Sequence, residues 1–200
     1  NITLGRLSRD VNGTNYDDNY PVGVMPYALK IGDKFQESNS YDGIASVYHK
    51  INKFKDSIEF HLKAIDIEKE INDKNGLASS YCNLSLTFFD SGQIDNAKDK
   101  LNKGISLFRE IGNQRAVEIG NFEMSRFLLS ENNLKSAINI LNSPIDFFEK
   151  INDNIFLIKS LIQLGILQRM SKVKDSSNTF NRALKIATKI KHQDFINTIK

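Results

Sequence analysis

Apolar positions along the chain recur with a fixed period of 40 residues. In each copy a large apolar residue is followed at once by a small one. The four clearest copies are Ile44-Ala45, Leu84-Ser85, Met124-Ser125 and Leu164-Gly165. A small side chain at a fixed helical position lets a second helix approach closely, while its bulky neighbour fills the space beside it. The pattern predicts a repeat architecture in which each copy begins with a closely packed helix.

A second apolar stripe follows each of these pairs. In the clearest copy it consists of Ala97, Leu101, Gly104, Ile105, Phe108 and Ile111, and in the next of Ala137, Leu141, Pro144, Ile145, Phe148 and Ile151. Their spacing places the residues of each copy on one side of a helix. In the last copy the stripe, which runs from Ser176 to Ile190, is shifted by one residue. We therefore expect that the turn near residues 171–174 has lost one position.

Short polar phrases separate the predicted helices. One phrase recurs as Ile31-Gly32-Asp33, Ile71-Asn72-Asp73, Ile111-Gly112-Asn113 and Ile151-Asn152-Asp153. Gly and Asn tolerate the left-handed conformation that ends many helices, and Asp and Asn cap the helix that follows. Asn52, Gly92 and Asn132 mark a second turn within each copy in the same way. The sequence thus predicts helix pairs over residues 37–73, 77–113, 117–153 and 157–192.

Three places depart from the regular pattern. Residues 1–33 form a degenerate copy, in which Pro21 and Pro26 interrupt the expected second helix, and residues 194–200 begin a further helix. Pro144 falls inside a predicted helix, where it cannot donate a hydrogen bond to the carbonyl of Ile140. We therefore expect a kink or break near residues 142–143, either as a local distortion or as a bend in the array.

The order of residue types resembles the tetratricopeptide repeat (TPR). In residues 41–48 (YDGIASVY) and 81–88 (YCNLSLTF), aromatic, large apolar, small and aromatic residues follow one another, and then come a turn and a second helix. The spacing of 40 exceeds the usual 34 and resembles the long repeats of bacterial signalling proteins, spindle-orientation adaptors and kinesin light chains. The resemblance implies an all-α, right-handed superhelical solenoid of antiparallel helix pairs. We expect about five repeats in a single domain over residues 1–200.

The resemblance also implies that the first helices line a concave, partner-binding groove. Carried over by register, the groove residues are Asp42, Ser46, His49, Cys82, Leu86, Phe89, Phe122, Arg126, Leu129, Ile162, Ile166 and Arg169. The Lys and Asn clamp with which chaperone-binding members hold a terminal carboxylate is not among them. A groove with this many apolar residues favours an amphipathic helix or a hydrophobic segment as ligand. In the alternative, the apolar members of this set pack between repeats.

Composition and charge bear on the class of protein, on its partners and on its location. The chain is 40% hydrophobic and 26% charged, as in globular proteins, and it has no apolar run of the roughly 18 residues that a membrane span needs. Its net charge is +3, and residues 161–200 are basic. We interpret this basic segment as a solvated helix face. We therefore expect neither direct nucleic-acid binding nor membrane insertion. The single cysteine, Cys82, fits the cytoplasm. Because the sequence starts at Asn1, a removed leader and a periplasmic location stay open.

No catalytic or metal-binding pattern stands out. The three histidines, His49, His61 and His192, lie in different repeats, and His61 takes the place of a core leucine, which indicates a buried structural histidine. We expect neither an enzyme nor a cofactor. We expect a non-catalytic scaffold that binds a protein or peptide, as the sensory or interaction arm of a larger regulatory protein. Two alternatives are a self-association module, which would make homo-oligomers, and an accessory domain of a multidomain enzyme such as a signalling kinase.

Overall fold

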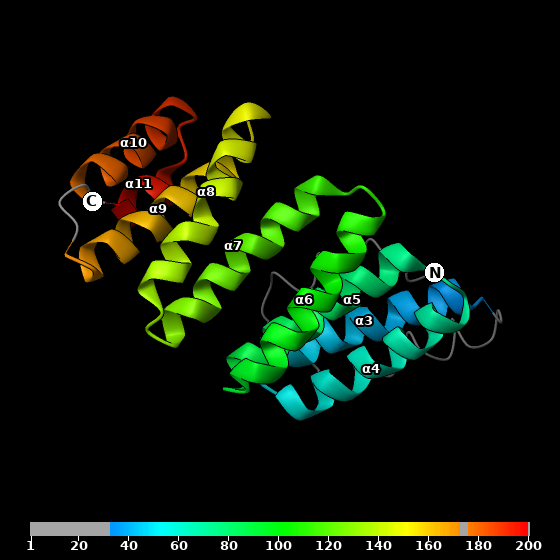
Figure 1. Cartoon of the computed structure of the whole chain (residues 1–200). Helices are drawn as coiled ribbons and strands as arrows, with labels where there is room; N and C mark the ends of the chain where they lie inside the picture. Colours follow the sequence, from blue (N-terminus) through cyan, green and yellow to red (C-terminus); the bar gives the residue numbers. More distant parts are fainter. Residues whose placement is uncertain (1–32, 173–175, 200) are drawn as a thin grey trace. The chain divides into compact units, whose positions relative to one another are not determined.

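The computed structural model describes residues 33–172 and 176–199, and within them it contains nine helices and no strand. The helices are α3 (Lys34–Lys50), α4 (Phe54–Glu70), α5 (Lys74–Asp90), α6 (Ile94–Glu110), α7 (Gln114–Ser130), α8 (Leu134–Lys150), α9 (Asn154–Met170), α10 (Ser176–Lys189) and α11 (Gln193–Ile199). Figure 1 shows them along the chain. The all-α helical-repeat class is confirmed. The degenerate copy expected over residues 1–33 lies outside the described residues, except for Asp33.

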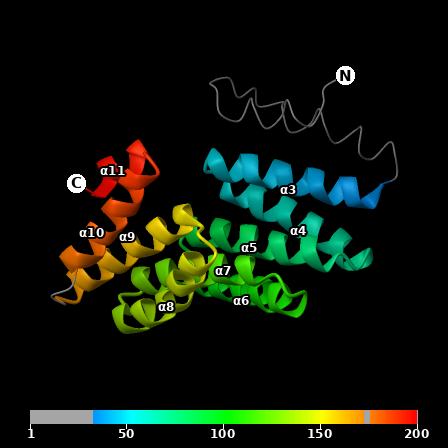
Figure 2. The same cartoon turned by 90° about the horizontal axis from the view of Figure 1, so that it is seen from above.

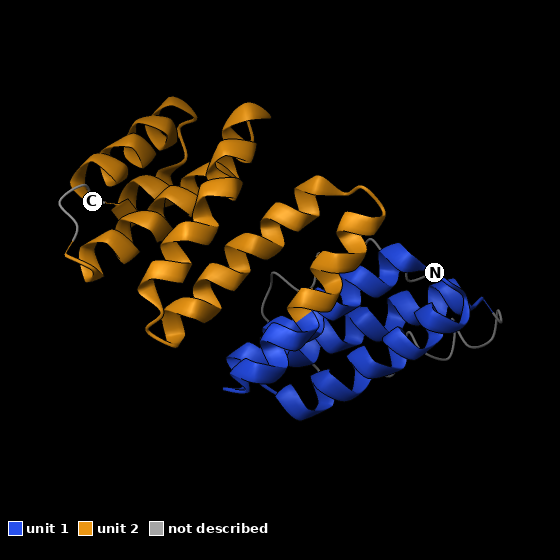
Figure 3. Cartoon of the chain, viewed as in Figure 1, with its two compact units in different colours: residues 1–100 blue, residues 101–200 orange. Residues whose placement is uncertain are grey.

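Contacts divide the chain into two compact units, residues 1–100 and 101–200 (Figure 3). In unit 1, α4 packs against both α3 and α5 (Figures 1 and 2). In unit 2, α8 packs against α7 and α9, and α10 packs against α9 and α11. From α3 to α9, three residues separate each helix from the next. The helix pairs α3–α4, α4–α5, α7–α8 and α8–α9 therefore pack as short-turned hairpins. The single domain over residues 1–200 stays a prediction.

The turns have the left-handed residues that the polar phrases predict. Positive φ angles occur at Asn52 (60°), Asn72 (55°), Gly92 (81°), Gly112 (76°), Asn132 (59°) and Asn152 (58°). Asn and Gly adopt this conformation at the least cost among the amino acids. After Asn72, Gly112, Asn132 and Asn152 the side chain of the next residue caps the following helix. At the first of these turns the Asp73 carboxylate accepts hydrogen bonds from the N–H groups of Asn75 and Gly76. Each turn thus ends one helix and starts another.

The last repeat has lost one residue, as the shifted stripe predicts. Forty residues after Asn132, Lys172 keeps a positive φ of 57°. Forty residues after Asn152 the position would be 192, yet the residue with positive φ is Lys191, at 56°. The missing position therefore lies between Lys172 and Lys191.

Close helix packing depends on the small residue of each first helix. Ala45, Ser85 and Ser125 are fully buried, and Gly165 is buried as well. A Cβ atom added to Gly165 would lie 2.8 Å from two ring carbons of Phe180. Helices α9 and α10 thus approach each other more closely than a larger side chain would allow.

Helix α8 continues without a break through Pro144, so the predicted break near residues 142–143 is wrong, whereas the kink stays a prediction. Pro144 is buried at the position that Ala64 and Gly104 occupy in the preceding repeats. Its compact ring fills this small site. Burial of the surrounding stripe offsets the lost backbone hydrogen bond, because tertiary packing outweighs local propensity within a buried helix.

Two glycine substitutions test the turn geometry. Gly92→Ala should lower the free energy of unfolding by about 1 kcal/mol, because alanine is strained at a φ of 81°. Gly43→Ala is the matched control, since Gly43 lies inside α3 and an added Cβ would meet no atom within 4 Å. It should raise the free energy of unfolding by about 0.5–1 kcal/mol. Urea denaturation followed by circular dichroism measures both, and equal effects would contradict the turn assignment.

Candidate partner-binding surface

The twelve residues expected to line a groove lie on the first helices of their repeats. Helix α3 carries Asp42, Ser46 and His49; α5 carries Cys82, Leu86 and Phe89; α7 carries Phe122, Arg126 and Leu129; α9 carries Ile162, Ile166 and Arg169. Within each helix the three residues are four and three positions apart, so they share one face. The first six belong to unit 1 and the last six to unit 2.

Asp42 is committed to contacts inside unit 1. Its Oδ1 atom lies 2.6 Å from Nδ1 of His61, and its Oδ2 atom accepts a 2.8 Å hydrogen bond from Nδ2 of Asn83. His61 is buried, as the sequence predicts for a structural histidine. One carboxylate therefore joins α3, α4 and α5, and both of its oxygens are in use. Asp42 thus supports the candidate surface and presents no free carboxylate to a partner.

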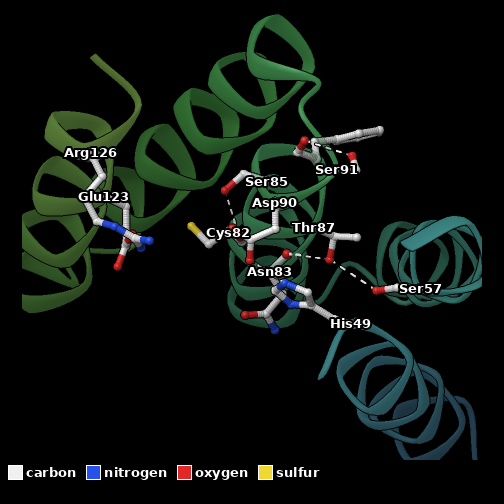
Figure 4. A network of polar contacts seen from close by, with 11 residues as sticks. His49, Ser57, Cys82, Asn83, Ser85, Thr87, Asp90, Ser91, Glu123 and Arg126 are labelled. Atoms are coloured by element: carbon white, nitrogen blue, oxygen red, sulfur yellow. Dashed lines mark hydrogen bonds and ion pairs between the residues drawn. The ribbon is translucent and has the colours of Figure 1, made fainter. Parts of the chain in front are cut away.

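The other polar residues of the α3 set also have partners in the same unit. The Ser46 hydroxyl donates to the backbone carbonyl of Asp42 over 2.9 Å. Nε2 of His49 lies 2.7 Å from Oδ2 of Asp90, which connects the C-terminal ends of α3 and α5, and Figure 4 shows both side chains. Near them, the Thr87 hydroxyl donates to the carbonyl of Asn83 and lies 3.2 Å from the hydroxyl of Ser57. The α3–α5 side of unit 1 is therefore held by polar contacts.

In unit 2 the predicted residues separate into core and surface. Phe122 is only 9% exposed and belongs to the hydrophobic core, against which Leu129 and Ile162 also pack. Ile166 is 38% exposed, and Arg169 is exposed. Truncation of Phe122 would therefore change stability as well as any surface contact. The residues of this set that reach solvent most are the two at the C-terminal end of α9.

Helix α9 presents an exposed apolar stripe that extends beyond the predicted residues. Met170 is 50% exposed one turn after Ile166, and Ile155 is 36% exposed near the start of the helix. We define the α9 stripe as Ile155, Ile162, Ile166 and Met170, which fall on one face at helical spacing. The sequence contained the signal for Met170, because it lies four residues after Ile166. Exposed apolar patches of this kind usually mark interaction sites.

The α9 stripe has basic side chains at its edges. Helix α9 contains no Asp or Glu, and its charged residues are Lys159 and Arg169. The Lys159 ammonium lies 4.9 Å from the centre of the Phe156 ring, and the Arg169 guanidinium lies 4.8 Å from that of Phe180. Both distances permit cation–π contact, which holds the two charges beside the stripe. The surface is therefore apolar and positively charged.

In residues 33–172 and 176–199, no three His, Cys, Asp or Glu side chains form a group that could hold a metal ion. No helix in the same part of the chain has the length and hydropathy to cross a membrane.

The paired helices, the left-handed turn residues and the small packing positions define a helical-repeat protein of the solenoid class. The tetratricopeptide repeat family model matches residues 36–110. These residues are therefore similar to tetratricopeptide repeats.

Comparisons with known proteins add relatives of low identity. Regulatory protein RapK of Bacillus subtilis (strain 168) is 23% identical over 158 residues, which are 78% of this chain and 40% of RapK. The crystal structure of aspartyl phosphate phosphatase F from Bacillus subtilis matches 97% of this chain and 52% of its own, with a TM-score of 0.89 and 13% identity. The Rap conjugation gene regulator of the plasmid pLS20, solved in complex with the Phr* peptide, matches 98% of this chain and 49% of its own, with a TM-score of 0.72 and 12% identity.

These comparisons support the fold over nearly the whole chain. The chain spans 40% of RapK and about half of each of the two solved structures. The activities of those longer proteins therefore do not transfer with the fold.

The structural role of Asp42 can be tested by substitution. Asp42→Ala should lower the free energy of unfolding by about 1–3 kcal/mol, because buried His61 and the Asn83 amide lose their acceptor. Ser46→Ala is the matched control on the same face, since its hydroxyl bonds only to its own helix, and it should stay within about 0.5 kcal/mol of the wild type. Urea denaturation measures both variants. If the two variants had equal free energies of unfolding, the structural role of Asp42 would be contradicted, and Asp42 would again be a candidate binding residue.

Proposed function

We propose that this chain is the interaction arm of a regulatory protein and that it binds a peptide or an amphipathic helical segment of a partner. The repeat class supports this, because such arrays offer rows of parallel first helices to a ligand. The names of its relatives are consistent with it, since RapK is a regulatory protein and the pLS20 regulator was solved with a peptide. Cytoplasmic location and the lack of direct nucleic-acid binding remain predictions.

The α9 stripe is the observation that carries the proposal. A helix that is apolar on all sides is usually buried, yet Ile155, Ile166 and Met170 are at least 36% exposed. A partner helix with leucine-like residues at i, i+3 and i+4 can cover such a stripe. Lys159 and Arg169 favour carboxylates at the edges of that partner. The ligand chemistry that fits is therefore an acidic amphipathic helix.

Unit 1 offers a narrower contribution to the same function. Asp42 and His49 are engaged with other side chains, whereas Cys82, Leu86 and Phe89 on α5 are partly exposed. Apolar side chains of α5 are thus the part of unit 1 suited to a hydrophobic ligand, and the polar residues of α3 keep that surface in shape.

We propose that the function is non-catalytic. The two histidines of unit 1 are engaged, since His49 pairs with Asp90 and His61 is buried against Asp42. A general acid or base needs access to a reacting group. Self-association is the second candidate, because the same exposed stripe could pair two copies of the chain.

A pair of designed peptides tests the proposal. We expect a fluorescein-labelled 18-residue helix of leucine and glutamate to bind the chain at low salt. The same helix with lysine in place of glutamate should bind about tenfold more weakly, because Lys159 and Arg169 repel it. Met170→Glu should weaken binding of the acidic peptide by about tenfold, because it places a carboxylate in the stripe. Fluorescence anisotropy measures both affinities.

The control variant is Leu62→Glu, which changes an apolar residue of similar exposure (42%) on the second helix α4. It should leave peptide binding unchanged. Equal binding of both peptides, or equal loss in Met170→Glu and Leu62→Glu, would contradict the α9 stripe as the site. Light scattering distinguishes self-association from peptide binding, because it measures the molar mass. If the mass of the wild type rises with concentration while Met170→Glu stays monomeric, the stripe serves self-association.

A further inference from the structure

Glu68 is a buried carboxylate at a position where the following repeats have a buried aromatic ring. The residues 40 and 80 positions later are Phe108 and Phe148, and both belong to the core. Glu68 is just as deeply buried, with 2% of its surface exposed, on α4 in unit 1. A carboxylate thus occupies a core site that the fold elsewhere gives to phenylalanine.

The hydrogen bonds around Glu68 suit a neutral carboxyl better than an ion. Its Oε1 atom accepts a 2.8 Å hydrogen bond from the Ser80 hydroxyl of α5. Its Oε2 atom is buried and has no hydrogen-bond partner in the part of the chain that the structure describes. An ionised carboxylate inside a protein needs several donors or a cation to offset its lost hydration.

The start of α5 lies beside Glu68 but does not supply those donors. A Cβ atom added to Gly76 would lie 3.2 Å from Oε1 of Glu68, so the carboxyl sits against the first turn of that helix. The N–H groups of Asn75 and Gly76 already donate to the Asp73 carboxylate. The N–H groups at the start of α5 therefore donate to Asp73 and not to Glu68. The Asp73 carboxylate is a second negative group close to Glu68.

The charged groups that act on Glu68 from the packed helices are acidic. Burial, and then the negative charges of Asp42 on α3 and Asp73 at the start of α5, raise the pKa of Glu68 to about 7, against the opposing effect of the Ser80 hydrogen bond. Two cations of these helices pair with other carboxylates: Lys34 of α3 with Glu70, and Lys69 of α4 with Asp66. On α4 itself, His61 is bound to Asp42.

We propose that Glu68 is a pH-dependent switch in unit 1, whose neutral form lets α4 pack on α5 and whose ionised form loosens that packing. The inference is independent of the proposed function. Because the pKa is higher in the folded chain than its ordinary value of 4.5, the stabilisation is complete below about 4.5 and is lost as the pH rises through about 7. Between these values the opening equilibrium should rise by up to roughly tenfold per pH unit, and then level off.

Hydrogen exchange measured by mass spectrometry, at pH values from 5 to 8 and corrected for intrinsic exchange, tests the switch. In the wild type the opening equilibrium of α4 and α5 amides should rise steeply between pH 5 and 7. Glu68→Gln replaces the neutral carboxyl by a neutral amide of the same shape, so its opening should stay within about twofold over this range. A flat wild-type profile, or a Glu68→Gln variant that keeps the slope, would overturn the proposal.

Glu118→Gln is the matched control. Glu118 is also buried, on α7 of unit 2, but both of its oxygens accept hydrogen bonds, from Gln114 over 2.5 Å and from Asn121 over 3.0 Å. This variant should keep the wild-type slope in α4 and α5, and loss of the slope would overturn the assignment to Glu68. If Glu68→Gln does not fold, carbon-13 NMR of the glutamate carboxyls in the wild type decides: one group titrating near pH 7 supports the switch, and none above pH 5.5 overturns it.

Discussion

The close approach of helices at one small residue per repeat is the constraint on which the rest of the structure depends. Ala45, Ser85, Ser125 and Gly165 hold this position, and at Gly165 not even a Cβ would fit beside Phe180. Helices that pack this closely on both sides need short turns, and such turns need the left-handed residues that recur along the chain. The register then decides which side chains enter the core and which remain at the surface of each first helix.

Most of the fold could be predicted from the sequence, because the periodic features are local. Helix positions, turn residues, the shifted last repeat and the burial of His61 all follow from spacing and residue type. Contacts between residues distant in sequence could not be predicted in this way: Asp42 was assigned to the surface, yet its partners lie 19 and 41 residues away. The break at Pro144 was wrong because the surrounding core outweighs a local preference. The burial of Glu68 could not be predicted, because a glutamate near a helix end normally faces water.

The two units fill equivalent core positions with different chemistry. Unit 1 has Glu68 with Ser80, and Asp42 with Asn83, where unit 2 has Phe148 with Ser160, and Phe122 with Gln163. In the described part of unit 2, the Ser160 hydroxyl and the Gln163 side-chain nitrogen are buried and have no hydrogen-bond partner, because phenylalanine replaces the acceptors. Polar networks inside a protein are sensitive to protonation, whereas apolar packing is not. We therefore propose that pH sensitivity lies in unit 1 and hydrophobic partner binding chiefly on α9 of unit 2.

The central claim is that the exposed faces of the first helices, and above all the α9 stripe, receive an acidic amphipathic helix. The most direct measurement is a titration of the nitrogen-15-labelled chain with the leucine–glutamate peptide, followed by backbone amide chemical shifts. We predict that the largest shift changes fall on residues 155–170 of α9. Changes concentrated on the second helices α8 and α10, with α9 unaffected, would contradict it.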